Sequence, residues 1–303
     1  LLVIANNFVP LFVYRKNSRI MASITIPYAV ADFIEMRERG FYYVDKTQYI
    51  AKLEDYKAPV FLRPRRFGKS LLVSTLACYY DRTKAHRFEE LFGDTWIGNH
   101  PTKEHNRYMI IRYDFSAMVM SDHIQGLAQN FNDLNCGPVE VMVVHNRDLF
   151  GDFEFSNRGD ASKMLEEVLT YARSHELPKV YILIDEYDVP LDKAFQYGYY
   201  KEMVTFIRGL LGDVLKTNDA LEFAVLTGCL RVSKESIFTG LNNFKILSIT
   251  DTRFDEQFGF TDREVKDLLS YYNVEDKFKE TKEWYDGYRF GNVDIYCPWD
   301  VIN

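Results

Sequence analysis

Residues 59–72 read Pro-Val-Phe-Leu-Arg-Pro-Arg-Arg-Phe-Gly-Lys-Ser-Leu-Leu. A short apolar run enters a turn that ends in Gly68, Lys69 and Ser70, and apolar residues at helical spacing follow. This layout is typical of a phosphate-binding loop between a buried strand and a helix, because N–H groups at the start of a helix face an anion and the helix dipole adds to them. The stretch therefore predicts an α/β fold with an anion site at this turn.

Two side chains of the turn have expected roles. Lys69 would reach the β- and γ-phosphates of a nucleotide, and the Ser70 hydroxyl would bind Mg²⁺. The consensus for such loops is G-x-x-x-x-G-K-[ST], and Arg63 occupies the place of its first glycine. Lys69 and Ser70 could also simply open a surface helix, so the loop needs the support of a second motif.

That second motif lies in residues 179–188, which read Lys-Val-Tyr-Ile-Leu-Ile-Asp-Glu-Tyr-Asp. Consecutive apolar residues followed by carboxylates indicate a buried parallel strand with acids at its carboxyl end, where ligands bind in open α/β sheets. Asp185 would hold Mg²⁺, and Glu186 would polarise the attacking water as a general base. A solvated strand end is the alternative. The two motifs together favour a nucleoside triphosphate site.

Two residues further along the chain are additional candidates. Thr227 lies at the end of the expected strand 221–228, where it could orient the water or sense the γ-phosphate; a local hydrogen bond is the alternative. Arg231 follows four residues later and is the best candidate for a charge-neutralising arginine, in cis or across a subunit interface. A structural ion pair is the alternative for Arg231, and Arg253 is a weaker candidate for the same role.

The three arginines of the loop have two alternative roles. Arg63, Arg65 and Arg66 could pair phosphates bidentately or contact a nucleic-acid backbone. They could equally form structural salt bridges with acids such as Asp45 or Asp188.

Composition sets broad limits on the protein class. The 303 residues are 47% hydrophobic and 27% charged, as expected for a globular protein. With a net charge of −7, the protein has no overall electrostatic attraction for nucleic acid. This charge does not exclude a local basic patch. The four cysteines lie far apart with no C-x-x-C, which predicts reduced thiols in the cytoplasm. No apolar run reaches the length of a membrane span, and the six histidines show no metal-ligand spacing.

Apolar patterning predicts alternating strands and helices. Besides the strand in 179–188, we expect strands at 60–62, 107–115, 221–228 and 244–249. We expect helices at 31–39, 47–53, 69–80, 161–174, 199–215, 261–272 and 276–285. The run Val-Glu-Val-Met-Val-Val at 139–144 favours a strand within a stretch, 118–160, that is otherwise hard to assign. This order predicts a mostly parallel five-stranded sheet with helices on both faces.

The expected organisation has three parts. Residues 1–23 are interpreted as an upstream extension or a disordered arm, 24–250 as the nucleotide-binding domain, and 251–303 as its helical C-terminal part.

Several uncommon strings, in this order, carry a resemblance to a known family. They lie at residues 42–47, 63–71, 113–116, 183–188, 226–231, 234–243, 258–261 and 284–291. Over about residues 24–303 the chain resembles a family of prokaryotic proteins with an AAA-ATPase-like domain. The Arg-Pro-Arg-Arg-Phe loop is itself that family's form, so Arg63 in the place of a glycine is not a defect of this chain.

The resemblance implies a P-loop NTPase fold of the additional-strand type, in which the fourth strand lies between the first and third. It implies ATP and Mg²⁺ as cofactors, and adenine rests on the resemblance alone. The expected catalytic residues are Glu186, Lys69, Thr227 and Arg231. The expected nucleotide-binding residues are Arg65, Arg66, Phe67, Gly68, Lys69, Ser70 and Leu71. The expected metal ligands are Ser70 and Asp185.

The predicted function is ATP binding with Mg-dependent hydrolysis that regulates or powers an attached or partner effector, with nucleic-acid processing as one option. Many relatives carry a PD-(D/E)XK nuclease-like domain next, and we expect such a region to begin near residue 303. The alternative is a nucleotide-gated interaction module with little turnover. A third hypothesis is direct nucleic-acid binding through Arg63, Arg65 and Arg66. Oligomeric state stays open.

Overall fold

The computed structural model describes residues 25–217, 221–229, 244–285 and 287–302. Its centre is a five-stranded parallel sheet in the order β2-β3-β4-β1-β5. The strands are β1 (Ala58–Leu62), β2 (Met109–Asp114), β3 (Val180–Asp185), β4 (Leu221–Gly228) and β5 (Phe244–Leu247). Since β4 lies between β3 and β1, the predicted fold class, with a fourth strand inserted between the first and third, is confirmed.

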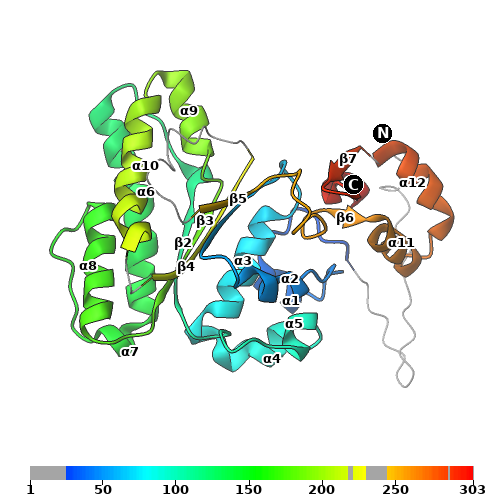
Figure 1. Ribbon diagram of the computed structural model, residues 1–303, viewed down its shortest axis with the longest axis horizontal. Helices are drawn as coiled ribbons and strands as arrows, with labels where there is room; N and C mark the ends of the chain where they lie inside the picture. The colour runs from blue at the N-terminus through cyan, green and yellow to red at the C-terminus, as the bar shows by residue number, and fades with distance from the viewer. Residues whose placement is uncertain (1–24, 218–220, 230–243, 286, 303) are drawn as a thin grey trace.

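Helices cover both faces of this sheet (Figure 1). One face carries α6 (Ile124–His145), α7 (Arg147–Phe150), α8 (Ala161–Ser174), α9 (Val189–Tyr197) and α10 (Tyr200–Thr217). The other face carries α1 (Phe33–Glu38), α2 (Gln48–Leu53), α3 (Lys69–Tyr80), α4 (Phe88–Phe92) and α5 (Trp96–Asn99). The described residues also contain the short 3-10 helices η1 (Arg82–Arg87), η2 (Phe115–Ala117) and η3 (Glu275–Lys277).

Burial on both faces explains the strand sequences. Every residue of β1 and β3 is buried, which is why both strands read as continuous apolar runs. One apolar core lies under the α6, α8 and α10 face, and a second lies under α3 and the N-terminal helices. The predicted helices at 69–80 and 161–174 are confirmed with the same bounds.

The expectation of a strand at 139–144 is wrong. These residues belong to α6, a helix of 22 residues. Val139 and Val143 are buried, four residues apart on the face toward the core, while Val144 is exposed. Packing of this helical face against the core therefore outweighs the intrinsic preference of valine for strands.

The C-terminal part is more than helical, which corrects the prediction. It contains α11 (Asp262–Tyr271), α12 (Phe278–Tyr285) and α13 (Pro298–Ile302). It also contains a small antiparallel sheet in the order β6-β8-β7, built from β6 (Phe260–Thr261), β7 (Tyr288–Phe290) and β8 (Val293–Tyr296). Figure 1 shows this part beyond the N-terminal end of α3, on the side away from α6 and α8. The capping box of Thr261 and Glu264 that opens α11 fixes where this helix begins.

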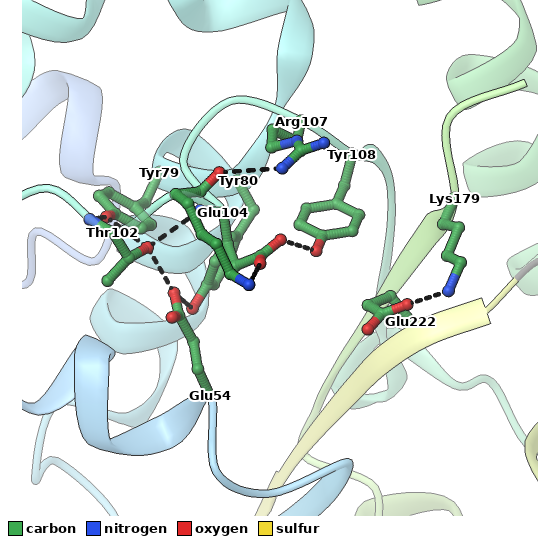
Figure 2. Close-up of polar contacts among 10 residues, drawn as sticks. Glu54, Tyr79, Tyr80, Thr102, Glu104, Arg107, Tyr108, Lys179 and Glu222 are labelled. Atoms are coloured by element: carbon green, nitrogen blue, oxygen red, sulfur yellow. Dashed lines mark hydrogen bonds and ion pairs between the residues drawn. The ribbon is translucent and has the colours of Figure 1, made fainter.

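A polar network closes the amino edge of the sheet, opposite the phosphate loop (Figure 2). The hydroxyls of Tyr80 and Thr102 donate to one carboxylate oxygen of Glu54, at 3.1 and 2.7 Å. Tyr108 donates to Glu104, just before β2. Burial is the main cause of a raised pKa at Glu54. This edge is therefore held by carboxylate–hydroxyl pairs together with the stacked rings of Tyr80 and Tyr181.

Candidate functional site

The phosphate loop joins β1 to α3, as the sequence predicts. Gly68 caps the helix in the left-handed conformation with φ 86°, where glycine carries no steric penalty. Lys69 opens the helix and is only 4% exposed. The first turn of a 12-residue helix therefore presents its N–H groups at the end of the loop, which suits an anion.

Lys69 lies at the centre of the site. Its Nζ donates to the main-chain oxygens of Arg63 at 3.2 Å and Pro64 at 3.1 Å, and it lies 3.2 Å from the Sγ of Cys229. It also forms an ion pair with Glu186, with 3.4 Å between Nζ and Oε1. The loop motif and the acidic strand motif, more than 100 residues apart in sequence, therefore meet at this ammonium group.

The carboxyl ends of β3 and β4 bring the other predicted residues together. Thr227 donates through Oγ1 to Oδ1 of Asp185 at 2.5 Å. The backbone N–H of Glu186 lies 3.4 Å from the same Oγ1. Tyr187 donates its backbone N–H to the main-chain oxygen of Thr227 at 3.0 Å. Thr227 therefore fixes both carboxylate residues at the end of β3.

The carboxyl of Glu186 has properties that suit a general base. Burial raises its pKa, the charges of Asp185 and Asp188 raise it further, and Lys69 opposes them. A raised pKa makes a carboxylate a stronger base at neutral pH. Glu186 also has φ 57°, an unfavourable backbone conformation for a residue with a side chain.

Strained backbone conformations are concentrated around this site. Six non-glycine residues of the described chain have positive φ, and three of them, Ala29, Arg66 and Glu186, line one pocket. Since such conformations persist where the surrounding structure enforces them, and often at ligand sites, their concentration supports a binding role for the pocket.

This pocket lies beside the loop and has a volume of about 290 Å³. Its lining comes from five segments that are distant in sequence, at residues 26–36, 42–50, 66–75, 257–268 and 298–302, together with Glu186. Apolar and aromatic side chains dominate it, including Tyr42, Tyr43 and Trp299. Sequence reasoning missed the pocket, although the strings at 42–47 and 258–261 were singled out by the resemblance.

Arg63 does not face the pocket. It is fully buried, and its guanidinium donates to the main-chain oxygens of Leu247 at 2.8 Å and Phe254 at 3.1 Å. The group also lies 5.1 and 5.2 Å from the ring centres of Phe258 and Phe290. Burial lowers the pKa of Arg63 to about 10, which leaves it charged at neutral pH. Arg63 therefore ties β1 to β5 and to the chain that follows it.

The other arginines separate into different positions. Arg65 is exposed and does not line the pocket, whereas Arg66 lines it with its guanidinium 4.3 Å from the ring centre of Trp299. Phe67 also lines the pocket, but its ring is buried against Tyr288 and Phe290. The residues from Gly68 to Leu71 line the pocket as well.

The charge-neutralising arginine and the magnesium ligands stay predictions. Arg231 lies outside the described residues, and Arg253 pairs with Asp251 at 2.6 Å on the surface. For the expected Mg²⁺, Ser70 and Asp185 offer the hard oxygen donors that this ion takes, often with one or two carboxylates beside phosphates. Within the described ranges, no group of three or more His, Cys, Asp or Glu side chains could hold a metal. The hydroxyl of Ser70 and the carboxylate of Asp185 would fit Mg²⁺ as two of its ligands, beside phosphate oxygens and water.

A known protein family matches the part of the chain that carries this site. The family model described as "Predicted AAA-ATPase" matches residues 27–238, which is more than half of the chain. The chain belongs to this AAA-ATPase-like family. The match spans the loop, the acidic strand end and Thr227, so the resemblance noted from the sequence is confirmed.

Two further comparisons place this AAA-ATPase-like chain among known proteins. It is 29% identical over 287 residues to the "Uncharacterized protein in vnfD 5'region" of Azotobacter chroococcum mcd 1. That alignment covers 93% of this chain but 52% of the relative, so the chain spans about half of the relative's length. The ORC2 protein of Aeropyrum pernix, solved with ADPNP and ADP, aligns with TM-score 0.37 and 10% identity over 82% of this chain and 54% of that one. In the part of the chain that the structure describes, no helix has the length and hydropathy to cross a membrane.

Proposed function

We propose that this AAA-ATPase-like domain binds ATP and hydrolyses it with Mg²⁺, and that the cycle regulates or powers an attached or partner effector. One observation carries the proposal: the Nζ of Lys69 lies 3.4 Å from Oε1 of Glu186, where the phosphate loop meets the end of β3. A candidate phosphate-binding cation and a candidate base are thus in contact beside a pocket of about 290 Å³ that would take a nucleoside.

The residues divide the work of binding. The N–H groups at the start of α3 and the ammonium of Lys69 would hold the β- and γ-phosphates. Arg66 would stand at the mouth of the apolar pocket that takes the nucleoside, and Arg65 would add positive charge outside it. When Lys69 turns from Glu186 to a phosphate, the Glu186 carboxylate becomes available for water.

The residues at the strand ends would carry the chemistry. Glu186 would accept a proton from the attacking water, and Thr227 would hold both Asp185 and the Glu186 backbone in position. Ser70 and Asp185 would hold Mg²⁺, which neutralises charge on the phosphate oxygens when bound. Arg231 remains the candidate for charge neutralisation at the γ-phosphate.

The route to an effector would begin at the C-terminal part. Phe67 of the loop packs on Tyr288 and Phe290 of the small sheet. A change in loop conformation would therefore shift the contacts with that sheet. The alternative function, a nucleotide-gated module with little turnover, uses the same contacts. The Lys69–Glu186 ion pair favours this gated module, because the pair keeps the candidate base occupied.

Glu186→Gln separates these two functions. We expect the variant to bind ATP but to lose at least 100-fold in hydrolysis rate, since a general base contributes about 10²–10⁴-fold. The matched control is Glu166→Gln, which changes an exposed glutamate on α8. Equal, negligible turnover in wild type and Glu186→Gln, with ATP bound by both, would support the gated module instead.

A further inference from the structure

One charged side chain of the pocket has no opposite charge beside it. Of the charged residues that line the pocket, Lys69 pairs with Glu186. Lys46 pairs with Glu264, with 2.7 Å between Nζ and Oε1. Arg66 lines the same pocket and is exposed, but its guanidinium makes no hydrogen bond or ion pair with another described residue. An unpaired guanidinium beside the phosphate loop points to an anion as its partner.

The ring of Trp299 holds this guanidinium. The central carbon of the Arg66 guanidinium lies 4.3 Å from the ring centre of Trp299, which also lines the pocket. A guanidinium over the face of a ring keeps its N–H donors available, because they lie in its own plane. Two adjacent donors of that plane can pair a phosphate bidentately. The contact with Trp299 therefore restricts Arg66 without using a donor that a phosphate needs.

The segment that carries Trp299 is itself anchored. Asp300 and Val301 donate their backbone N–H groups to the main-chain oxygen of Cys297, at 3.1 and 3.2 Å. Cys297 is 4% exposed and directly follows β8. The ring of Trp299 also packs against that of Tyr28, with 5.0 Å between the ring centres. The indole is therefore held both by the end of the small sheet and by the N-terminal end of the described chain.

The backbone that carries Arg66 is fixed to the same C-terminal part. The Sγ of Cys297 lies 3.9 Å from the main-chain oxygen of Arg66. Gly259 donates its N–H to the main-chain oxygen of Phe67 at 3.3 Å. Arg66 has φ 70°, an uncommon conformation for a residue with a side chain, which surrounding contacts must maintain. Both partners of the Arg66–Trp299 contact thus belong to one connected structure beside the start of α3.

We propose that Trp299 is a positioning residue: its ring holds Arg66 at the pocket, and Arg66 binds a phosphate group of the nucleotide. This inference rests on the proposed nucleotide-binding function. Arg66 lies two residues before Gly68, and the helix that follows Gly68 presents its N–H groups at the same turn. A long side chain loses rotamer freedom when it binds a ligand, so a ring that already restricts Arg66 lowers that cost.

The same contact makes the C-terminal segment a regulator of the site. Trp299 belongs to α13 and Arg66 to the phosphate loop, so nucleotide affinity would depend on whether α13 is docked. Coupling between two such events is reciprocal. An effector that draws α13 away would therefore weaken nucleotide binding, and nucleotide would oppose that displacement by the same factor.

The test is a double-mutant cycle for binding of ADP, which avoids hydrolysis, measured by calorimetry on the full chain. We expect Arg66→Met to weaken ADP binding by about tenfold or more, because it removes a charged donor. Trp299→Leu should weaken it by about two- to fivefold, the size of an exposed cation–π interaction. In Arg66→Met, adding Trp299→Leu should cause no further loss, because a positioning residue acts only through the residue that it positions.

Arg66→Lys is the second variant, because it leaves the C-terminal segment untouched. Lysine keeps the positive charge but lacks the flat guanidinium. We expect Arg66→Lys to bind ADP at least as weakly as Trp299→Leu, and wild-type affinity in this variant would contradict the inference. Trp299→Phe keeps an aromatic face over Arg66 and should recover part of the affinity that Trp299→Leu loses.

Two matched controls change the same residue types elsewhere. Trp284→Leu replaces a tryptophan that is 73% exposed on α12, and Arg158→Met replaces an exposed arginine before α8. Both should bind ADP as wild type. Thermal melting of each variant without nucleotide separates a change of fold from a change of affinity, and Arg66→Lys decides the test if Trp299→Leu does not fold.

The outcomes are distinct. If folded Trp299→Leu binds ADP as tightly as wild type, the inference is wrong while the proposed function stands. If the losses of Trp299→Leu and Arg66→Met add in the double variant, Trp299 contacts the nucleotide itself and the inference is wrong as well. If the wild type binds neither ADP nor ATP, the proposed function fails and takes the inference with it.

Discussion

Glu186 and Lys69 hold each other at 3.4 Å across the phosphate loop, so the proposed base and the proposed phosphate ligand occupy one ion pair. The pair is largely buried, with side-chain exposures of 19% and 3%. Each charge therefore compensates the other in a place where neither is well solvated. Nucleotide binding would exchange this partner for a phosphate.

Lys69→Met should weaken binding of ATP by about 10- to 100-fold, because a hydrogen bond from a charged group contributes roughly 1.5–3 kcal/mol. Fluorescence titration with an ATP analogue measures the loss. Lys163→Met, at a lysine whose side chain is 59% exposed on α8, is the matched control and should bind as wild type. Unchanged affinity in Lys69→Met would show that the loop does not bind phosphate.

Thr227→Val should reduce hydrolysis by about tenfold or more with little change in ATP affinity. The variant keeps the shape of threonine but removes the hydroxyl that donates to Asp185 at 2.5 Å, so the carboxylate loses its fixed position. Steady-state kinetics separate kcat from KM. Thr227→Ser restores the hydroxyl and should recover most of the rate. A lasting loss in the serine variant would argue for packing of the methyl group instead.

Arg63→Met should destabilise the protein by about 3 kcal/mol, because buried main-chain oxygens lose a charged donor. These include the oxygens of Leu247 and Phe254. Arg65→Met, at an exposed arginine, should change the unfolding free energy by about 0.5 kcal/mol or less. Urea denaturation compares the two. The reverse order would mean that Arg63 acts at the surface, as a nucleic-acid contact requires.

Glu54→Gln should remove a pH dependence of stability. Burial raises the pKa of Glu54 in the folded protein, so folding favours its protonated form. Its stabilising contribution is therefore complete below the pKa of an unfolded glutamate and is lost as pH rises through the folded pKa. Glutamine still accepts from Tyr80 and Thr102 (Figure 2).

The measurement is the unfolding free energy of both proteins at about pH 4, just below the ordinary glutamate pKa near 4.3, and at about pH 7.5. The wild type should lose stability relative to Glu54→Gln on going to the higher pH. A constant difference between the two proteins at both pH values would contradict the assignment. Glu166→Gln, on the exposed face of α8, should show no such change.

The sheet could be predicted from sequence because its signals are local and agree with one another. The run at 179–188 is apolar, then acidic, and β3 ends at Asp185 as that pattern requires. Gly68 and Lys69 similarly mark the start of α3. Where two local signals conflict, prediction fails: the valines of 139–144 favour a strand, but their spacing of four suits the face of α6.

The pocket could not be predicted, because it depends on contacts between distant segments. Gln257 lies in a short string with no periodicity, and nothing local shows that it lines a pocket together with residues 26–36 and 298–302. The role of Arg63 could not be predicted for the same reason. Two of its three hydrogen-bond partners are main-chain oxygens more than 180 residues away, and none is a carboxylate of Asp45 or Asp188. Sequence shows which side chains carry charge but not which carbonyl groups reach them.

The position of Trp299 over Arg66 has a consequence for how the protein is made. Residues near 26 and residues 298–302 line the same pocket, so its walls are incomplete until the ribosome has synthesised nearly the whole described chain. A ligand stabilises only the state that binds it. Under the proposed function, nucleotide would therefore stabilise this pocket only after residues 298–302 have been synthesised.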